Sequence, residues 1–187
     1  LIVHDWGGAI GMGLATRYPE LIERVVVLNT AAFLSQNIPK RIALCKAGKF
    51  GEFIVRQFNA FAWPATFMAS QKSLSKEVKA AYLAPYDNWD NRIAVSRFVQ
   101  DIPLDPSHPS YGTLKTIEEG LSKIKVPLLI IWGGKDFCFD REFFERWVEL
   151  FPEAEAHWLS QAGHYVLEDA PKQSIETIVK FLADTTP

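Results

Sequence analysis

One aspartate stands where its carboxylate could act as a nucleophile. Asp5 follows the apolar run 1–4 and precedes Trp6-Gly7-Gly8. Small residues after such a side chain permit a sharp turn from a strand into a helix, which exposes the side chain above the sheet and turns the next amide toward developing negative charge. A carboxylate with a reference pKa near 4 is ionised at neutral pH. It can therefore attack carbon without a base and form an ester on the protein.

Such an ester must be hydrolysed, and a histidine near the end of the chain could activate the water. His164 follows Gly163 and the last run that predicts a strand. A third group should orient the imidazole and stabilise its charged form, and Asp136 stands in the turn after another predicted strand. We predict Asp5 as nucleophile, His164 as base and Asp136 as the acid that orients it. This order along the chain is the one found in α/β-hydrolases.

Each of these residues also has a simpler explanation. Asp5 could cap the helix that follows it, and Asp136 could be a turn residue. Asp140 is a rival for the acid, although it too stands where a helix cap is expected. No zinc-type Cys/His spacing and no Gly-rich phosphate loop occurs, so no metal or cofactor is predicted. The other histidines have no recognisable partner and are expected to be structural: His4, His108 and His157.

The elements that must position these residues alternate between strand and helix. Apolar, β-branched runs predict strands at 1–4, 24–29, 127–132 and, more weakly, 155–160. Apolar residues with helical spacing predict helices at 9–18, 140–151 and 172–183. The alternation predicts an α/β fold class with a parallel sheet and helices on both of its faces.

Residues 34–122 interrupt this alternation and contain nothing that resembles a buried parallel strand. Helical patterns occur at 42–46, 52–60 and 93–99. We expect Gly48 and Gly51 to separate the first two as helix breakers, and the prolines between 103 and 109 to form turns. We therefore predict a mostly helical cap at 34–122, between core segments 1–33 and 123–187. It should cover the C-terminal ends of the strands, where open α/β sheets bind ligands.

The composition is that of a globular protein and excludes several classes. The 187 residues are 48% hydrophobic, with 20 Lys+Arg against 22 Asp+Glu and a formal charge of -2. A disordered chain would be less apolar, a nucleic-acid binder more basic, and a membrane helix would need about 20 consecutive apolar residues. Two cysteines make no disulfide framework, which favours the cytoplasm. The expected partner is a small hydrophobic substrate, not a nucleic acid or a membrane.

Over nearly its whole length the chain resembles the haloalkane dehalogenase branch of the α/β-hydrolase superfamily. The resemblance lies in 3–8 (Val-His-Asp-Trp-Gly-Gly), in the acid turn 132–137 and in Gly163-His164. Segments 84–92 and 98–103 also resemble the cap of dehalogenase-like proteins, among them the β-lactone decarboxylases of bacterial olefin biosynthesis. The resemblance implies an α/β-hydrolase fold with a helical cap, and most directly the hydrolysis of a carbon–halogen bond to an alcohol and a halide.

The resemblance also implies roles for individual residues. In the family, the Trp after the nucleophile donates its indole N–H to the departing halide, which assigns this role to Trp6. The second donor is a cap Trp, for which Trp63 is the candidate, or an Asn in a loop that this sequence does not contain. A β-lactone decarboxylase would use Asp5 on a lactone and release carbon dioxide and an alkene. An epoxide hydrolase would need acidic hydroxyls, for which cap tyrosines are available: Tyr82, Tyr86 and Tyr111.

The position of the nucleophile strand within the chain leads to a further expectation. The family places this strand in the middle of the sheet, with several strands before it in sequence, whereas here it is the first four residues. A bare apolar edge invites association. We expect that the chain lacks the N-terminal strands and that Leu1–His4 pairs with that missing part or with another chain. The alternative from another functional class is a catalytically silent C-terminal fragment.

Overall fold

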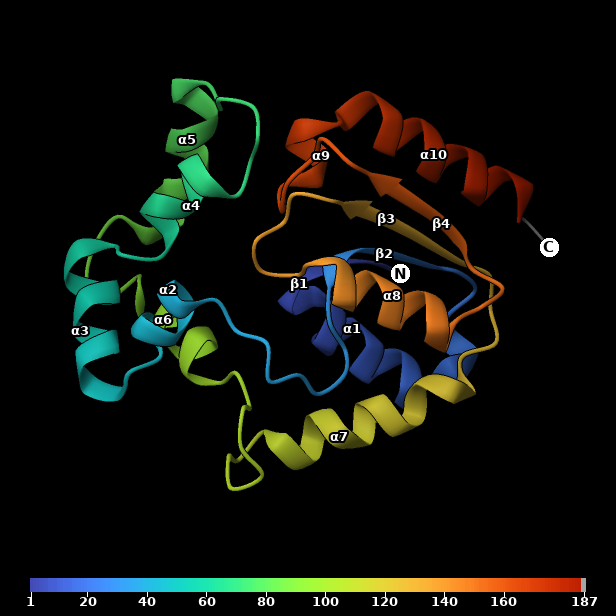
Figure 1. Ribbon diagram of the computed structural model, residues 1–187, viewed down its shortest axis with the longest axis horizontal. Coiled ribbons are helices and arrows are strands. Elements are labelled where there is room, and N and C mark those ends of the chain that lie inside the picture. Colours follow the sequence, from blue (N-terminus) through green and yellow to red (C-terminus); the bar gives the residue numbers. More distant parts are fainter. Residues whose placement is uncertain (186–187) are drawn as a thin grey trace.

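A four-stranded parallel sheet between helical layers forms the centre of the computed structural model, which describes residues 1–185 (Figure 1). The strands lie in the order β1-β2-β3-β4, and each neighbouring pair is parallel. Their bounds are β1 (Ile2–Asp5), β2 (Val25–Thr30), β3 (Leu128–Gly133) and β4 (Glu155–Leu159). The predicted α/β class, with a parallel sheet and helices on both faces, is confirmed.

The helices connect the strands and form the segment between β2 and β3. They are, in chain order, α1 (Trp6–Arg17), α2 (Lys40–Cys45), α3 (Gly48–Phe58), α4 (Ala62–Met68), α5 (Lys76–Leu83), α6 (Ile93–Gln100), α7 (Tyr111–Gly120), α8 (Arg141–Leu150), α9 (Val166–Asp169) and α10 (Pro171–Asp184). Short 3-10 helices lie at Pro19–Leu21, Ala84–Tyr86 and Leu121–Lys123.

Successive side chains of the middle strands enter two separate apolar clusters. Val25 and Val27 of β2 pack with residues of α1, α7 and α8 on one face, whereas Val26 and Leu28 pack with residues of α10 on the other. Because strand side chains alternate between faces, a strand covered on both sides must be apolar at every position. This requirement explains why uninterrupted apolar runs predicted β2 and β3 correctly.

Helices α2 to α6 lie apart from the sheet, on the side toward which the strands point (Figure 1). They have a small apolar cluster of their own, which includes Cys45, Val55 and Val99. Helix α7, by contrast, packs against α1. The cap boundaries at residues 34 and 122 stay a prediction.

The expectation that Gly48 and Gly51 separate two helices holds for Gly48, which follows the end of α2, but is wrong for Gly51. Gly48 has a φ of 52° and begins α3, and Gly51 lies inside that helix. A Cβ at Gly51 would run into the carbonyl group of Cys45, so glycine allows α3 to approach α2. Gly51 thus serves for close packing rather than for a chain break. Helices α4, α5 and α7 were not predicted, because their short apolar patterns are weak.

β1 forms one edge of the sheet and pairs with β2 alone among the described residues. Val3 is buried, whereas Ile2, whose side chain points to the opposite face, is 54% exposed. The expectation that this edge pairs with further strands or with another chain stays a prediction. Within residues 1–185, no helix combines the length and the apolar character that crossing a membrane requires.

Candidate active site

Asp5 lies at the junction of β1 and α1 with a strained backbone. Its φ and ψ are 49° and -128°, a conformation that costs a non-glycine residue about 1–3 kcal/mol. The pairing of β1 with β2 shifts register between His4 and Asp5, and the Thr30 hydroxyl donates to the Asp5 carbonyl. Gly8 lies so close to the Thr30 side chain that a Cβ would collide with it. These contacts hold the sharp turn that the sequence predicts.

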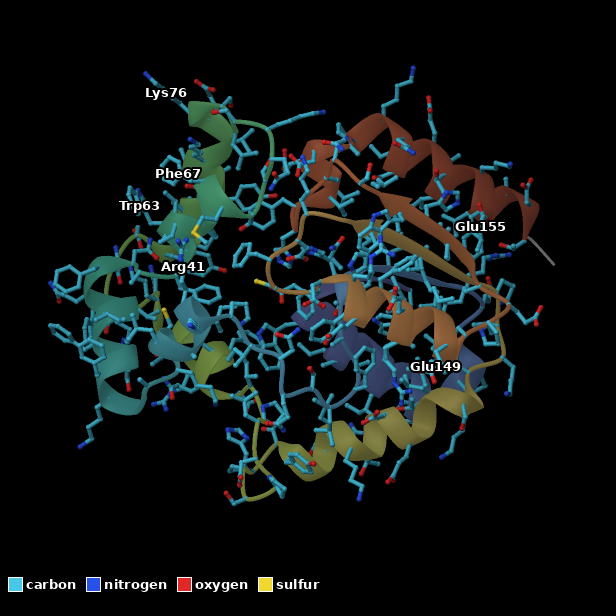
Figure 2. The ribbon with its side chains drawn as sticks, viewed as in Figure 1. Arg41, Trp63, Phe67, Lys76, Glu149 and Glu155 are labelled. Atoms are coloured by element: carbon cyan, nitrogen blue, oxygen red, sulfur yellow. The ribbon has the colours of Figure 1, made fainter. Side chains whose placement is uncertain are left out.

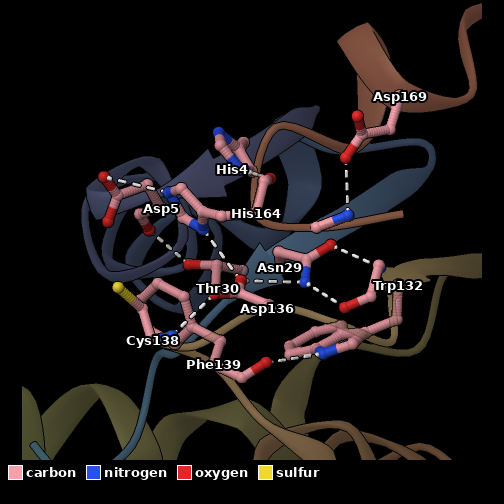
Figure 3. A network of polar contacts seen from close by, with 12 residues as sticks. His4, Asp5, Asn29, Thr30, Trp132, Asp136, Cys138, Phe139, His164 and Asp169 are labelled. Carbon is pink, nitrogen blue, oxygen red and sulfur yellow. Dashed lines mark hydrogen bonds and ion pairs between the residues drawn. The ribbon is translucent and has the colours of Figure 1, made fainter. Parts of the chain in front are cut away.

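The simple capping role for Asp5 does not fit this geometry. Asp5 occupies the N-cap position of α1, but its side chain accepts no capping hydrogen bond. The carboxylate instead turns toward an imidazole, and its Oδ2 lies 3.8 Å from His164 Nε2 (Figure 3). The Asp5 side chain is 46% exposed. It is therefore accessible and has a charged neighbour, as a nucleophile requires.

His164 is bound on its other nitrogen by the predicted acid. His164 Nδ1 lies 2.8 Å from Asp136 Oδ2, and both side chains are buried. Asp136 Oδ1 accepts the Cys138 amide hydrogen at 2.7 Å, and Asn29 Nδ2 donates to Oδ2 at 2.9 Å. The rival Asp140 instead caps α8 through the Glu142 amide. The structure thus brings together Asp5, Asp136 and His164, and it places Asp140 elsewhere.

Two carboxylates on one imidazole determine the charges of the site. Desolvation works to lower the pKa of His164, but Asp136 and Asp5 outweigh it and raise this pKa to about 10. Desolvation works to raise the pKa of Asp5, but His164, His4 and the Trp6 amide outweigh it and hold this pKa below its ordinary value. At neutral pH the site therefore contains an imidazolium between two carboxylates. Conversion of Asp5 into a neutral ester would remove one of these charges and lower the pKa of His164.

The raised pKa of His164 predicts how stability depends on pH. The folded protein keeps this proton up to about pH 10, whereas the reference pKa is 6.5. The resulting stabilisation is complete below pH 6.5 and is lost as pH rises to about 10. We expect the difference in unfolding free energy between the wild type and His164→Gln to shrink from pH 6 to pH 10 in urea titrations. A difference that stays constant over this range would contradict the charge assignment.

The two tryptophans predicted to contact the substrate lie in different places. Trp6 begins α1, next to Asp5, and its ring packs against Phe98 of α6 with centroids 5.2 Å apart. Among residues 1–185 its indole N–H donates to no protein atom, so it is available to a leaving group. Trp63 packs on Phe67 and is 54% exposed, and Figure 2 shows both on the outer side of α4. The structure does not bring Trp63 to Asp5, and its substrate role stays a prediction.

Sequence reasoning missed residues that contact the cluster of Asp5, His164 and Asp136. His4, expected to be structural without a known partner, lies beside His164: its Nε2 is 2.9 Å from the His164 carbonyl oxygen, and the centroids of the two rings are 4.6 Å apart. Burial lowers the pKa of His4, and the charged His164 lowers it further, so His4 is neutral. Asn29 holds Asp136 and also exchanges hydrogen bonds with the Gly133 backbone. Both residues belong to strands whose apolar character concealed them.

The chain belongs to the alpha/beta hydrolase fold family, whose model matches residues 1–171. It is 45% identical over 99% of its length to a cis-3-alkyl-4-alkyloxetan-2-one decarboxylase from Shewanella oneidensis, and 40% identical over 97% to one from Xanthomonas campestris. The chain spans 60% and 62% of the length of these two relatives. Both are enzymes by name, and their names correspond to the second chemistry that the sequence resemblance implied.

Haloalkane dehalogenases are also similar to the chain, at lower identity. The enzyme from Mycolicibacterium paratuberculosis is 24% identical over 97% of the chain, which spans 59% of that relative. The crystal structure of haloalkane dehalogenase DbeA from Bradyrhizobium elkani superposes with a TM-score of 0.90 at 21% identity, over 99% of this chain and 67% of that one. The predicted resemblance and the α/β-hydrolase fold are thus confirmed, whereas a dehalogenase specificity is not.

Proposed function

We propose that the chain carries the nucleophile, acid and base of a decarboxylase acting on cis-3,4-dialkyl β-lactones through an ester on Asp5. The observation that carries this proposal is the 45% and 40% identity to two decarboxylases over nearly the whole chain, against 24% to a haloalkane dehalogenase. The dehalogenase chemistry, which the sequence resemblance favoured, becomes the second candidate. Both reactions begin with attack of a carboxylate on carbon and release of an anion, which is the chemistry that Asp5 and Trp6 suit.

The reaction can be written without any added reactant. An Asp5 carboxylate oxygen bonds to ring carbon C4 while the bond from C4 to the ring oxygen breaks, which frees the lactone carboxyl group as a carboxylate. The bond between C3 and the carboxylate carbon then breaks, and its electron pair forms the C3–C4 double bond. At the same time the bond from C4 to the Asp5 oxygen breaks. Carbon dioxide and an alkene leave, Asp5 regains its charge, and neither water nor a proton is consumed.

In this route His164 acts as a cation rather than as a base. The imidazolium lies 3.8 Å from Asp5 and is held on its other side by Asp136. A nearby positive charge stabilises a carboxylate, which makes Asp5 a better leaving group in the second step. The indole N–H of Trp6 can donate to the carboxylate that forms in the first step. The raised pKa of His164 supports this role at neutral pH.

The surroundings of Asp5 suit alkyl substituents. Phe98 of α6 lies against the Trp6 ring, and Phe139 lies against the His164 ring with centroids 5.7 Å apart. Burial, together with Asp136 and Asp5, raises the pKa of the Cys138 thiol, which therefore stays uncharged. Apolar and aromatic walls with few polar groups are typical of sites for hydrophobic small molecules. They favour hydrocarbon-bearing substrates without distinguishing a lactone from a haloalkane.

Turnover in oxygen-18 water distinguishes these two candidates. Water that hydrolyses an ester attacks its carbonyl carbon, so dehalogenation leaves solvent oxygen in the Asp5 carboxyl group. Fragmentation breaks the bond between C4 and the Asp5 oxygen and leaves no solvent oxygen there. We expect a cis-3,4-dialkyloxetan-2-one to give alkene and carbon dioxide without labelling the Asp5 peptide in mass spectrometry. A labelled peptide from the lactone, or turnover of 1-chlorohexane alone with labelling, would contradict the decarboxylase proposal.

The epoxide hydrolase alternative has less support from the tyrosines. The hydroxyl group of Tyr82 donates to Glu168 Oε1 at 3.0 Å, and its ring stacks on Tyr165. Tyr165 lies next to His164, but its pKa is raised to about 12. Burial is the main cause of this rise, and the negative charge of Asp5 adds to it. A phenol with a raised pKa is a poorer proton donor to an opening epoxide. The silent-fragment alternative predicts no covalent product with any of the three substrate classes.

A further inference from the structure

Asp169 is a buried carboxylate that the proposed chemistry does not use. It is 5% exposed and ends α9, five residues after His164. It faces no cation among the described residues and is satisfied by backbone and hydroxyl donors alone. Desolvation works to raise its pKa, but these hydrogen bonds outweigh it and keep the carboxyl group ionised. A charge buried with so many aligned donors holds those donors in place.

The donors to Asp169 come from two separate segments of the chain. Gly163, directly before His164, donates its amide to Oδ2 at 2.6 Å (Figure 3). On the loop between α4 and α5, Gln71 N is 2.9 Å from both oxygens, and Lys72 N and Ser70 Oγ donate to Oδ1 at 2.8 and 2.6 Å. Asp169 therefore joins the loop that carries His164 to residues 70–72 of the loop between α4 and α5.

Two further features show that the two loops are fitted to each other. The amide of Tyr165, directly after His164, donates to the Ala69 carbonyl oxygen at 2.7 Å. A Cβ at Gly163 would lie 2.9 Å from that same oxygen and 3.3 Å from Asp169 Oδ2. Glycine is thus needed at 163 for the close approach of the loops. The backbone on both sides of His164 is bound to segment 69–72, directly or through Asp169.

We propose that Asp169 is a positioning residue that holds the His164 imidazole at its working distance from Asp5. It does so by tying the loop that carries His164 to residues 70–72, between α4 and α5. The proposal rests on the function proposed above, in which His164 acts on the Asp5 ester. Apart from Asp169, the backbone of this loop is held from outside by the Tyr165 amide, which donates to the Ala69 carbonyl oxygen at 2.7 Å, and by His4 Nε2, which lies 2.9 Å from the His164 carbonyl oxygen. Loss of Asp169 would leave His164 bound to Asp136 but allow its backbone to shift.

The test compares formation and breakdown of the Asp5 ester in the whole protein. Asp169→Asn turns one acceptor into a donor that faces other donors, so His164 should shift while Asp5 stays in place. We expect breakdown to slow by about 10- to 100-fold, with ester formation and KM nearly unchanged, so that the ester accumulates. Ser70→Ala removes one hydroxyl donor but keeps the charge, and we expect the same selective effect at a few-fold. Asp105→Asn, at an exposed turn carboxylate, is the matched control and should change neither step.

Amide exchange separates failure of this inference from failure of the proposed function. We expect the Gly163 and Lys72 amides to exchange faster in Asp169→Asn, with global unfolding less affected, whether or not the lactone is a substrate. If the wild type and His164→Ala form no adduct, the proposed function fails while exchange still tests the link between the loops. Any of three results in Asp169→Asn or Ser70→Ala would overturn the positioning role. Ester formation and breakdown could slow equally, both rates could stay unchanged, or the Gly163 and Lys72 amides could exchange as they do in the wild type.

Discussion

Substitution of Asp5 by asparagine is expected to lower kcat on the β-lactone by at least about 10⁴-fold, the scale seen when a covalent nucleophile is removed. The amide keeps the volume of the side chain, and asparagine tolerates the positive φ of this position better than most residues. It lacks the charge that attacks C4 and cannot leave as an anion. Loss of this charge should also lower the pKa of His164, which NMR titration of the imidazole can follow.

The control for this experiment must exclude deamidation and misfolding. Intact mass spectrometry shows whether asparagine at position 5 has reverted to aspartate, which would restore activity in time. Asp105→Asn again serves as the matched loss of one carboxylate at an exposed turn. A properly folded Asp5→Asn protein that retains kcat within tenfold of the wild type would show that another group forms the bond to carbon.

Substitution of His164 by alanine is expected to separate the two chemical steps. Asp5 needs no base for its attack, so the ester should form at a rate close to that of the wild type. Its breakdown should slow by at least about 10³-fold, because the neighbouring charge that helps Asp5 to depart is lost. Rapid-quench measurements would then show nearly stoichiometric adduct and very slow release of alkene and carbon dioxide.

A histidine outside the site provides the control for this substitution. His157 lies on β4, and its Nε2 is 2.7 Å from Glu155 Oε1, so its side chain is engaged outside the cluster of Asp5, His164 and Asp136. His157→Ala should therefore leave both steps unchanged. If His164→Ala instead slows ester formation as much as breakdown, the imidazole acts before the bond to Asp5 forms, and its assigned role is wrong.

Much of the fold could be predicted because of how the sheet is buried. β2 is apolar from Val25 to Leu28 and β3 from Leu128 to Trp132, so their positions stand out in the sequence, and their ends were predicted within one residue. The segment between them is built from short helices with exposed aromatic side chains, such as Phe53, Phe58 and Trp63. α3 keeps an amphipathic pattern and was predicted, whereas α4 exposes Trp63 and α5 buries no residue, so helical periodicity found only some of these helices.

The central residues of the site could be predicted because each stands at the end of a strand. Parallel strands end at the same edge of a sheet, so Asp5, Asp136 and His164 had to lie near one another. His4, Asn29 and Asp169 could not be assigned in this way. His4 and Asn29 lie within strands, and Asp169 resembles an ordinary acidic residue before the helix that begins at Pro171. Their roles depend on distances between loops that sequence spacing does not contain.

The substrate class is the part of the prediction that changed most. The turn at Asp5, the acid turn 132–137 and Gly163-His164 would serve dehalogenation and β-lactone decarboxylation equally well, because both proposed reactions would make and break an ester of Asp5. The difference lies in whether water or carbon–carbon cleavage removes that ester. The identity to two named decarboxylases over nearly the whole chain shifted the proposal toward cleavage.

Peptide mapping of His164→Ala after incubation with a cis-3,4-dialkyloxetan-2-one tests the central claim most directly. We predict that the peptide containing Asp5 gains the mass of the intact lactone, since ring opening expels no atoms, and that Asp5→Asn in the same background abolishes the gain. A protein that gains no mass, or that gains it on another residue, would contradict the assignment of Asp5 as the nucleophile.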